Sequence, residues 1–275
     1  MDTSATATTP TTTAPLAPAP AATALPDAVP PARVAVVTGA GTGIGRATAR
    51  AFAGQGVTVV AVGRRKSPLR ETAEGHPGIH PFVADVTAEG AAEAIVSAAL
   101  TAHGRLDVLV NNAGVSGGGP LGTLDRSAIA PLLETNLVAP VLLTQAAVPA
   151  LRASRGVVVN VTTTVGQRGW PSGSVYPATK SALETLTRCW ALELAPDGVR
   201  VVAVAPGAIE TPIAEHMGLS PERLEALRAW QLAHTPLGRI GRPEEAAWAI
   251  TTLAAPGAAF LTGTVLPVDG GALVT

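Results

Sequence analysis

Short apolar runs alternate with helical patterns from residue 33 to the end of the chain. The runs are rich in Val and Ala, and they are continuous rather than alternating, which is typical of strands covered by helices on both faces. Because parallel strands separated by helices form right-handed crossovers, the pattern predicts one α/β domain on a doubly wound, parallel, seven-stranded sheet. Strands are expected at residues 34–38, 57–62, 79–84, 106–110, 157–161, 199–204 and 265–268. Helices are expected at residues 44–53, 88–103, 129–152, 175–195, 221–232 and 243–254, with a polar, partly helical connection before the third strand.

Residues 1–32 differ from the rest because they are almost entirely Thr, Ala and Pro. Such a segment buries little and is interrupted by prolines, so we expect a disordered N-terminal extension before a single domain over residues 33–275. No basic segment precedes an apolar core there, which argues against a secretory signal.

Charge and composition narrow the functional classes. The net charge is −1 and charged residues make up 14% of the chain, which argues against a nucleic-acid surface or a polybasic membrane anchor. No stretch approaches the roughly 18 uninterrupted apolar residues of a membrane span, and no cluster of His, Cys, Asp or Glu has metal-ligand spacing.

Cys189 is the only cysteine. We expect a buried thiol there and a reducing, cytoplasmic compartment.

A glycine-rich turn follows the first predicted strand. Gly39, Gly43 and Gly45 form a Gly-x-x-x-Gly-x-Gly pattern, with Thr42 and Ile44 inside it, just before a helix. Glycines permit positive φ and close approach of the backbone to a ligand, and a helix N-terminus offers free N–H groups to an anion. The turn is predicted to bind the pyrophosphate of a dinucleotide; the alternative is a glycine turn without a ligand.

The end of the second predicted strand indicates which dinucleotide binds. An NAD site usually places a carboxylate there, on the ribose 2′-hydroxyl, but this strand ends in Val62-Gly63-Arg64-Arg65-Lys66. The planar guanidinium of Arg64 or Arg65 suits a 2′-phosphate instead. The sequence favours NADP(H), with NAD(H) as the alternative; a solvated basic loop is the other interpretation.

Tyr176 and Lys180 form a second chemical feature. They lie four residues apart on a predicted helix, so their side chains share a face, and Pro177 requires this helix to begin close to Tyr176. A free tyrosine has a pKa of about 10 and is a poor acid–base catalyst at neutral pH. A nearby ammonium and an oxidised nicotinamide both favour the phenolate, so the pair is predicted to transfer protons.

Together, these motifs resemble those of a known family, the single-domain short-chain dehydrogenase/reductases, over residues 33–275. The resemblance rests on the glycine turn, on Asn111-Asn112-Ala113-Gly114, on Tyr176 with Lys180, and on Pro206-Gly207 at the end of a strand. It implies a Rossmann-like fold and a tyrosine-dependent oxidoreductase of the ketoreductase kind that uses NAD(P). It also implies a homotetramer or a homodimer.

By position, the resemblance makes Tyr176 the proton donor or acceptor and Lys180 the residue that holds the nicotinamide ribose and lowers the tyrosine pKa. Asn136 matches the helix asparagine that fixes a water for proton relay. The resemblance also implies residues at three places along the cofactor. Asp85 and Val86 are expected at the adenine, and Asn112, Ala113 and Gly114 beside the cofactor. The positions expected at the nicotinamide carboxamide are Pro206, Gly207, Ile209 and Thr211.

The chain departs from the family at Thr163, where a serine is usual. A threonine hydroxyl can still donate a hydrogen bond to a substrate carbonyl, but the extra methyl group restricts χ1 and takes space. We expect a functional Thr163 with altered substrate fit. The alternatives are a weakened catalytic role, or the use of Thr162 or Thr164 instead.

The substrate pocket is expected between residues 115–119, residues 164–170 and a lid at about residues 208–236. Low charge in these segments favours a neutral, fairly bulky carbonyl compound or alcohol. The residues expected to line it are Val115, Ser116, Thr164, Trp170, Met217 and Trp230. The sequence thus predicts NADPH-dependent ketone reduction; the alternatives are a non-redox enzyme on the same scaffold, such as an epimerase, dehydratase or cyclase, and a catalytically weakened nucleotide-binding protein.

Overall fold

The computed structural model describes residues 32–167, 173–213 and 220–275. The chain divides into two units, Met1–Pro31 and Ala32–Thr275, and the second contains all of the described residues. The predicted disorder of residues 1–32 therefore concerns a segment that, apart from Ala32, lies outside the description.

Seven parallel strands form one sheet in the order β3-β2-β1-β4-β5-β6-β7. The strands are β1 (Val34–Thr38), β2 (Thr58–Gly63), β3 (Ile79–Val83), β4 (Val108–Asn111), β5 (Val157–Val161), β6 (Arg200–Pro206) and β7 (Val265–Val268). The order reverses between β1 and β4, which confirms the doubly wound sheet. In such sheets a ligand binds at the carboxyl ends of the strands beside this switch point.

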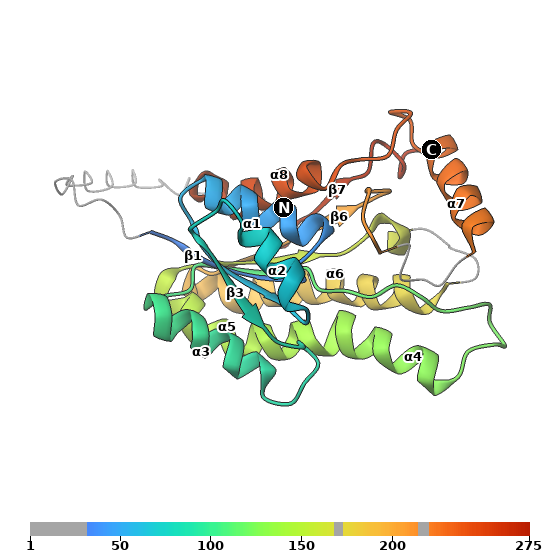
Figure 1. Cartoon of the computed structure of the whole chain (residues 1–275). Coiled ribbons are helices and arrows are strands. Elements are labelled where there is room, and N and C mark those ends of the chain that lie inside the picture. Colours follow the sequence, from blue (N-terminus) through green and yellow to red (C-terminus); the bar gives the residue numbers. More distant parts are fainter. Residues whose placement is uncertain (1–31, 168–172, 214–219) are drawn as a thin grey trace, which may run out of the picture. The chain divides into compact units, whose positions relative to one another are not determined.

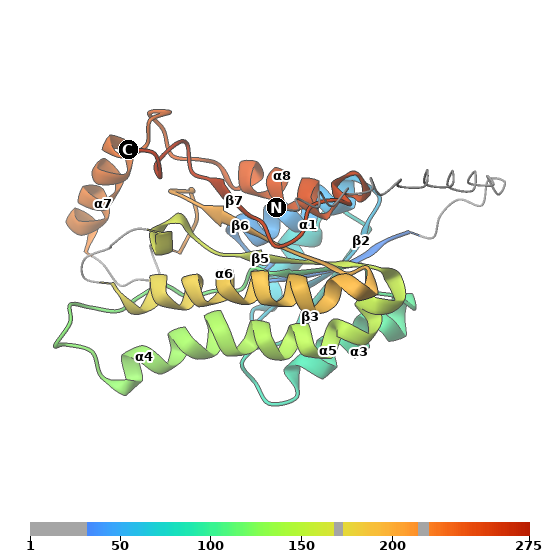
Figure 2. The same cartoon turned by 180° about the vertical axis from the view of Figure 1, so that it is seen from behind.

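Helices cover both faces of the sheet (Figure 1, Figure 2). One layer contains α1 (Gly43–Gly54), α2 (Lys66–Ala73) and α8 (Pro243–Ala254), and the other contains α3 (Ala91–His103), α5 (Ala139–Ser154) and α6 (Val175–Leu194). Two buried cores fill the spaces between sheet and helices. Phe52 and Ile250 lie in the first and Ile95 and Leu143 in the second, each side chain contributing about 1.5–3 kcal/mol on burial.

The helix predicted at residues 129–152 is interrupted. It consists of α4 (Arg126–Leu133), a π-helical turn (Glu134–Val138) and α5. A π turn holds one extra residue and often marks a functional site, and a periodic sequence pattern does not reveal it. By length and composition alone, Arg126–Ser154 could span a membrane, and 33% of its most apolar window is buried. The buried residues Leu143, Ala147 and Leu151 pack into the second core.

Helix α6 begins one residue before Tyr176, as Pro177 predicts. Cys189 of this helix is exposed, so the prediction of a buried thiol is wrong. The buried face of this part of α6 contains Thr187, Ala191 and Leu194, and Cys189 points away from it. An apolar run cannot fix which face of a helix meets the core when most of its residues are apolar.

Candidate active site

The glycine turn joins the carboxyl end of β1 to α1, at the switch point of the sheet. Gly39 and Gly43 have φ of 63° and 51°, a conformation that side chains disfavour. A Cβ atom on Gly45 would overlap the carbonyl oxygen of Gly39. The first turn of α1 has no acidic residue, and the N-cap residue Thr42 makes no side-chain cap. The free N–H groups of this turn and the Cβ-free cradle fit a pyrophosphate.

Thr38 and Asn112 hold the turn in place. The Thr38 hydroxyl oxygen accepts hydrogen bonds from the backbone N–H groups of Asn112 and Ala113, both at 3.0 Å. The Asn112 amide donates in turn to the carbonyl oxygen of Thr38 at 2.8 Å. Asn112 and Ala113, both predicted to border the cofactor, thus lie directly against the glycine turn.

Sequence reasoning missed Arg46, which lies in the first turn of α1. Its Nε and Nη2 donate to the carbonyl oxygen of Gly41 at 3.0 Å and 2.6 Å. Nη2 also pairs with Oε2 of Glu71 on α2 at 3.0 Å. Arg46 therefore ties the glycine turn to the helix that follows Arg64 and Arg65, and its place directly after Gly45 was the signal available in the sequence.

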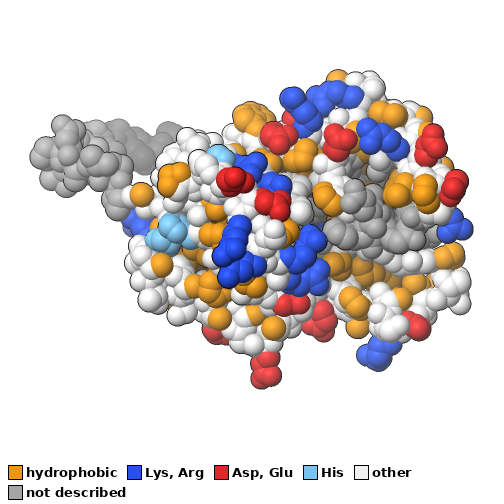
Figure 3. All heavy atoms as spheres, viewed as in Figure 1, with side chains coloured by type: hydrophobic (Ala, Val, Ile, Leu, Met, Phe, Trp, Pro, Cys, Tyr) orange, Lys and Arg blue, Asp and Glu red, His pale blue; other side chains and the backbone are white. Residues whose placement is uncertain are grey.

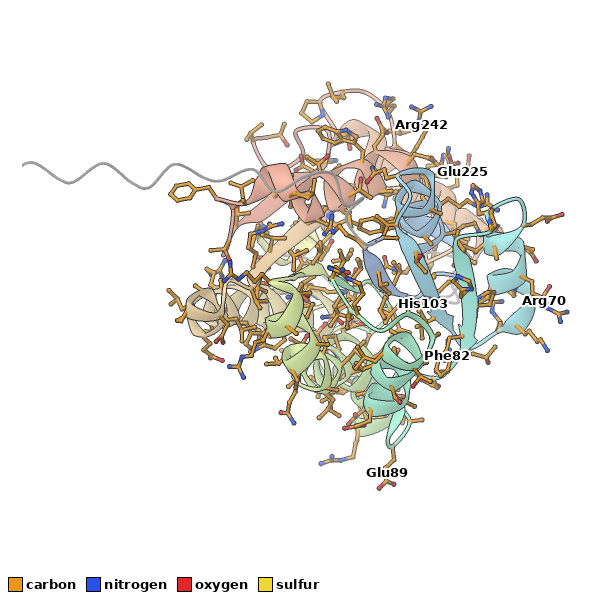
Figure 4. All side chains as sticks on the ribbon, turned by 90° about the vertical axis from the view of Figure 1, so that its left-hand side faces the viewer. Arg70, Phe82, Glu89, His103, Glu225 and Arg242 are labelled. Carbon is orange, nitrogen blue, oxygen red and sulfur yellow. The ribbon has the colours of Figure 1, made fainter. Side chains whose placement is uncertain are left out.

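Arg64 and Arg65 are both exposed where β2 ends and α2 begins. The backbone N–H and the hydroxyl of Thr87, with a contribution from the charge of Arg64, hold the pKa of Asp85 below its usual range. Arg64 and Asp85 therefore lie near one another after adjacent strands. Figure 3 shows basic side chains gathered around α2 with acidic ones among them, and Figure 4 shows that Arg70 points outward. Val86, the other residue predicted at the adenine, is partly buried against the second core.

Lys180 is buried and its Nζ donates to the carbonyl oxygen of Val161 at 2.8 Å. Burial lowers the pKa of Lys180 to about 8. Burial also raises the pKa of Tyr176 to about 12, and the side chain of Thr163 acts in the opposite direction. The lowering of this pKa by Lys180 that the family resemblance implies is absent from the causes of the shift. The structure thus brings Tyr176, Thr163 and Lys180 together at the carboxyl end of β5.

Asn136 lies fully buried in the π turn, and its side chain forms two hydrogen bonds with the backbone of Val115. The amide oxygen accepts from the N–H of Val115 at 2.9 Å, and the amide nitrogen donates to its carbonyl oxygen, also at 2.9 Å. The same nitrogen lies 3.2 Å from Oγ1 of Thr179. A Cβ atom on Gly114 would lie 3.3 Å from both Asn136 Oδ1 and Lys180 Nζ, so these two side chains meet beside Gly114.

The three consecutive threonines point to different partners. The hydroxyls of Thr163 and Thr164 donate to the carbonyl oxygen of Pro206, at 3.3 Å and 3.4 Å. The hydroxyl of Thr162 donates to Glu184 instead, at 3.2 Å. Of the three, Thr163 is the one that interacts with Tyr176, which favours it over its neighbours as the serine replacement.

The segment after β6 reaches the glycine turn. A Cβ atom on Gly43 would lie 3.0 Å from Cγ2 of Thr211. Ile209 forms a parallel bridge with Gly241, and the side chain of Asp269 lies against Gly207. The predicted cofactor positions after β6 therefore lie over the same end of the sheet as the glycine turn.

The predicted substrate side is described in part. Val115 and Ser116 are partly exposed, and Thr164 is buried with its hydroxyl turned to Pro206. Trp230 lies on α7 (Pro221–Ala233) and stacks on His234 with ring centroids 4.1 Å apart. Trp170 and Met217 lie outside the described residues, as does part of the predicted lid. Within the described ranges, no group of three or more His, Cys, Asp or Glu residues could hold a metal.

Comparison with known proteins identifies the family. Residues 39–272 match the family model described as "Enoyl-(Acyl carrier protein) reductase". The chain is 39% identical to "3-oxoacyl-[acyl-carrier-protein] reductase FabG" of Thermotoga maritima, over 88% of this chain and 98% of that protein. It is 40% identical to "L-fucose dehydrogenase" of Bos taurus, over 87% and 89% of the two chains.

A similar solved structure is that of 3-ketoacyl-(acyl-carrier-protein) reductase from Brucella melitensis complexed with NADH. It superposes with a TM-score of 0.82 at 32% identity, covering 88% of this chain and 98% of that one. A short-chain dehydrogenase/reductase from Caenorhabditis elegans, solved with cofactor, matches with a TM-score of 0.81 at 33% identity, over 88% of this chain and 96% of that one. This chain therefore belongs to the short-chain dehydrogenase/reductase family of NAD(P)-dependent oxidoreductases.

Proposed function

We propose that this protein uses NADPH to reduce the carbonyl group of a neutral, fairly bulky small molecule, and oxidises the secondary alcohol in reverse. The observation that carries the proposal is the position of Lys180, whose buried Nζ donates to the carbonyl oxygen of Val161 at 2.8 Å, two residues before Thr163 and one helical turn after Tyr176. These three groups lie at the carboxyl ends of the strands, where the glycine turn also lies. That arrangement supports proton transfer to a carbonyl held next to a dinucleotide.

Each side chain has a distinct task in this proposal. Tyr176 is protonated at neutral pH, which is the form that can act as the acid, but burial raises its pKa to about 12 and so makes it a weaker acid. In this proposal the positive charge of Lys180 offsets part of that effect during proton transfer. Thr163 donates a hydrogen bond to the substrate carbonyl oxygen and so polarises it. Lys180 and Asn136 return a proton to Tyr176 from solvent. NADPH, when bound, supplies the hydride.

The cofactor preference rests on Arg64 and Arg65. Both guanidinium groups are exposed where the adenosine ribose of a dinucleotide on this turn would lie. No carboxylate follows β2 directly, since its last residue is followed by Arg64, Arg65 and Lys66. We therefore propose that the two arginines hold a 2′-phosphate and that NADP(H) is preferred to NAD(H).

We also propose a cytoplasmic homodimer or homotetramer. Support comes from large apolar side chains left exposed in the isolated domain, among them Trp248 at 67% and Phe260 at 102%. Neighbouring copies would bury such side chains.

The proposal is tested with the purified protein, NADPH and a panel of neutral ketones, by following the loss of NADPH absorbance. We expect turnover with at least one bulky ketone and a loss of about 10²–10⁴ in kcat for Tyr176→Phe, while NADPH binding measured by calorimetry is unchanged. Conversion of a substrate without net NADPH consumption would favour an epimerase, dehydratase or cyclase. NADPH binding without any turnover would favour a nucleotide-binding protein.

A further inference from the structure

Glu184 is a buried carboxylate on α6, one helical turn beyond Lys180, and the proposed reaction does not use it. Its Oε1 accepts two hydrogen bonds, from Oγ1 of Thr162 at 3.2 Å and from Nε2 of Gln167 at 3.0 Å. Both donors are neutral, and none of the ion pairs among the described residues includes Glu184. A carboxylate is costly to bury unless hydrogen bonds compensate. A buried carboxylate at this position therefore needs its two hydrogen bonds, which makes a structural or functional role for them the natural explanation.

The two donors lie on either side of Thr163. Thr162 precedes it at the end of β5, and Gln167 ends the short 3-10 helix Thr164–Gln167 that follows it. One carboxylate oxygen therefore bridges the residue before Thr163 and the turn after it. This turn leads into the region where the sequence places the substrate.

Two further side chains of α6 hold the same segment. Nζ of Lys180 donates to the carbonyl oxygen of Val161 at 2.8 Å, and Oγ of Ser181 donates to the carbonyl oxygen of Gly166 at 2.9 Å. With Glu184, these bonds fasten residues 161–167 to the helix that carries Tyr176. Glu184 is the member of this set that bonds both to the residue before Thr163 and to the last residue of the 3-10 turn.

The Thr162 hydroxyl has two acceptors within reach, the carboxylate of Glu184 and the carbonyl oxygen of Val204. That hydroxyl has one hydrogen, and it lies 3.3 Å from the carbonyl oxygen of Val204 as well as 3.2 Å from Glu184. The contact with Glu184 is the shorter of the two, and it connects the end of β5 to α6.

We propose that Glu184 is a positioning residue that fixes Thr163 and the 3-10 turn against α6, and so sets how the carbonyl substrate fits beside Tyr176. This inference rests on the proposed carbonyl reduction. Positioning matters because a shift of about 1 Å in a reacting group can cost roughly 10² in rate.

The kinetic test compares Glu184→Ala, which removes both bonds, with Glu184→Gln, whose amide oxygen can accept both. Glu193→Gln is the control, because Glu193 is exposed on the same helix. We expect Glu184→Ala to raise KM for the ketone about tenfold and lower kcat, with KM for NADPH changed less than about twofold. Glu184→Gln should restore most of the loss. Gln167→Ala should reproduce the effect on ketone KM, and adding it to Glu184→Ala should cost little more.

Hydrogen exchange gives a readout that does not depend on activity. In Glu184→Ala, the backbone amides of residues 163–167 should exchange faster, while Glu184→Gln and Glu193→Gln should match the wild type. If the wild type reduces no ketone, the proposed function fails, and the exchange data still decide whether Glu184 holds the segment. The inference would be overturned if, in Glu184→Ala, the amides of residues 163–167 exchange as in the wild type and the KM values for ketone and NADPH are unaffected or change equally. Should Glu184→Ala not fold, Gln167→Ala and Thr162→Val test the two bonds separately.

Discussion

The ammonium group of Lys180 and the carbonyl oxygen of Val161 are joined by a 2.8 Å hydrogen bond. This bond connects the helix that carries Tyr176 to the strand that leads to Thr163. Lys180 is buried, and burial lowers its pKa to about 8. A lysine kept charged at neutral pH in such a place costs stability, so catalysis and stability make opposite demands on this residue.

Lys180→Met is expected to abolish turnover and to stabilise the fold. The folded pKa of about 8 lies below the usual 10.5, so the unfolded chain binds more protons between these values and wild-type stability rises with pH through this window. Below pH 8 the wild type bears the full cost of burying the charged lysine, on the order of 3 kcal/mol. Loss of the donor to Val161 offsets part of the stability that the variant gains. Urea unfolding of the wild type and the variant from pH 7 to pH 10.5 measures the difference in their free energies of unfolding. A variant that is less stable at pH 7, or that keeps the wild-type pH slope, contradicts this account.

The pH dependence of ketone reduction should follow Lys180 rather than Tyr176. As the pH rises through about 8, Lys180 loses the charge that favours proton return, so the rate should fall. Tyr176 stays protonated throughout because burial raises its pKa to about 12. The measurement is kcat at saturating NADPH from pH 6 to pH 10. A profile that stays flat to pH 10 would show that Lys180 does not titrate in this range.

Thr163 is expected to act through its hydroxyl group, while its methyl group limits the substrate range. Thr163→Ser keeps the donor and opens space beside Tyr176, so activity should be retained and bulkier ketones accepted. Thr163→Val keeps the shape and removes the hydroxyl, so kcat should fall about 10²–10³-fold. Steady-state kinetics on the same ketone panel measure both. Equal activity of Ser and Val variants would mean that the hydroxyl takes no part in the reaction.

The sequence predicted the sheet well because its signal is local. The central strands are mainly apolar runs buried from both sides, while the edge strands β3 and β7 are more exposed. Every predicted strand occurs within two residues of its expected ends. Tyr176 and Lys180 could be paired for the same reason, since an i, i+4 spacing on a helix fixes their common face. The grouping of Asn136, Gly114 and Lys180 followed only from family resemblance, because no local pattern brings residues so far apart in the chain together.

The features that sequence reasoning missed depend on tertiary packing. Glu184 looks like one of several glutamates on helices until the structure places it against Thr162 and Gln167. The π turn around Asn136 has no periodic signature in the sequence, and the bonds of that side chain to the backbone of Val115 join residues 21 positions apart. Cys189 was misplaced since an apolar helix segment does not show which of its sides faces the core.

Gly45→Ala should abolish dinucleotide binding, because the added Cβ would overlap the carbonyl oxygen of Gly39 and displace the turn. Gly54→Ala is the matched control in the same helix, since a Cβ there meets nothing within 4 Å. That change should be neutral or stabilise by up to about 1 kcal/mol. Calorimetric titration with NADPH and NADH measures binding, and thermal unfolding shows whether each variant is folded. A folded Gly45→Ala that binds either dinucleotide like the wild type would show that the cradle lies elsewhere.

Replacing Arg64 and Arg65 together by Ala should change the cofactor preference. Two charge-assisted hydrogen bonds to a 2′-phosphate contribute about 1.5–3 kcal/mol each, so KM for NADPH should rise at least tenfold while KM for NADH changes little. Arg70→Ala is the control, because Arg70 is exposed on α2 and points away from the protein (Figure 4). The control removes one positive charge nearby and should alter both KM values slightly and equally. Equal increases in the KM values for NADPH and NADH in the double variant would show that the arginines do not hold the phosphate. Salt gives a second measurement. Raising the salt concentration should weaken NADPH binding by the wild type more than by the double variant.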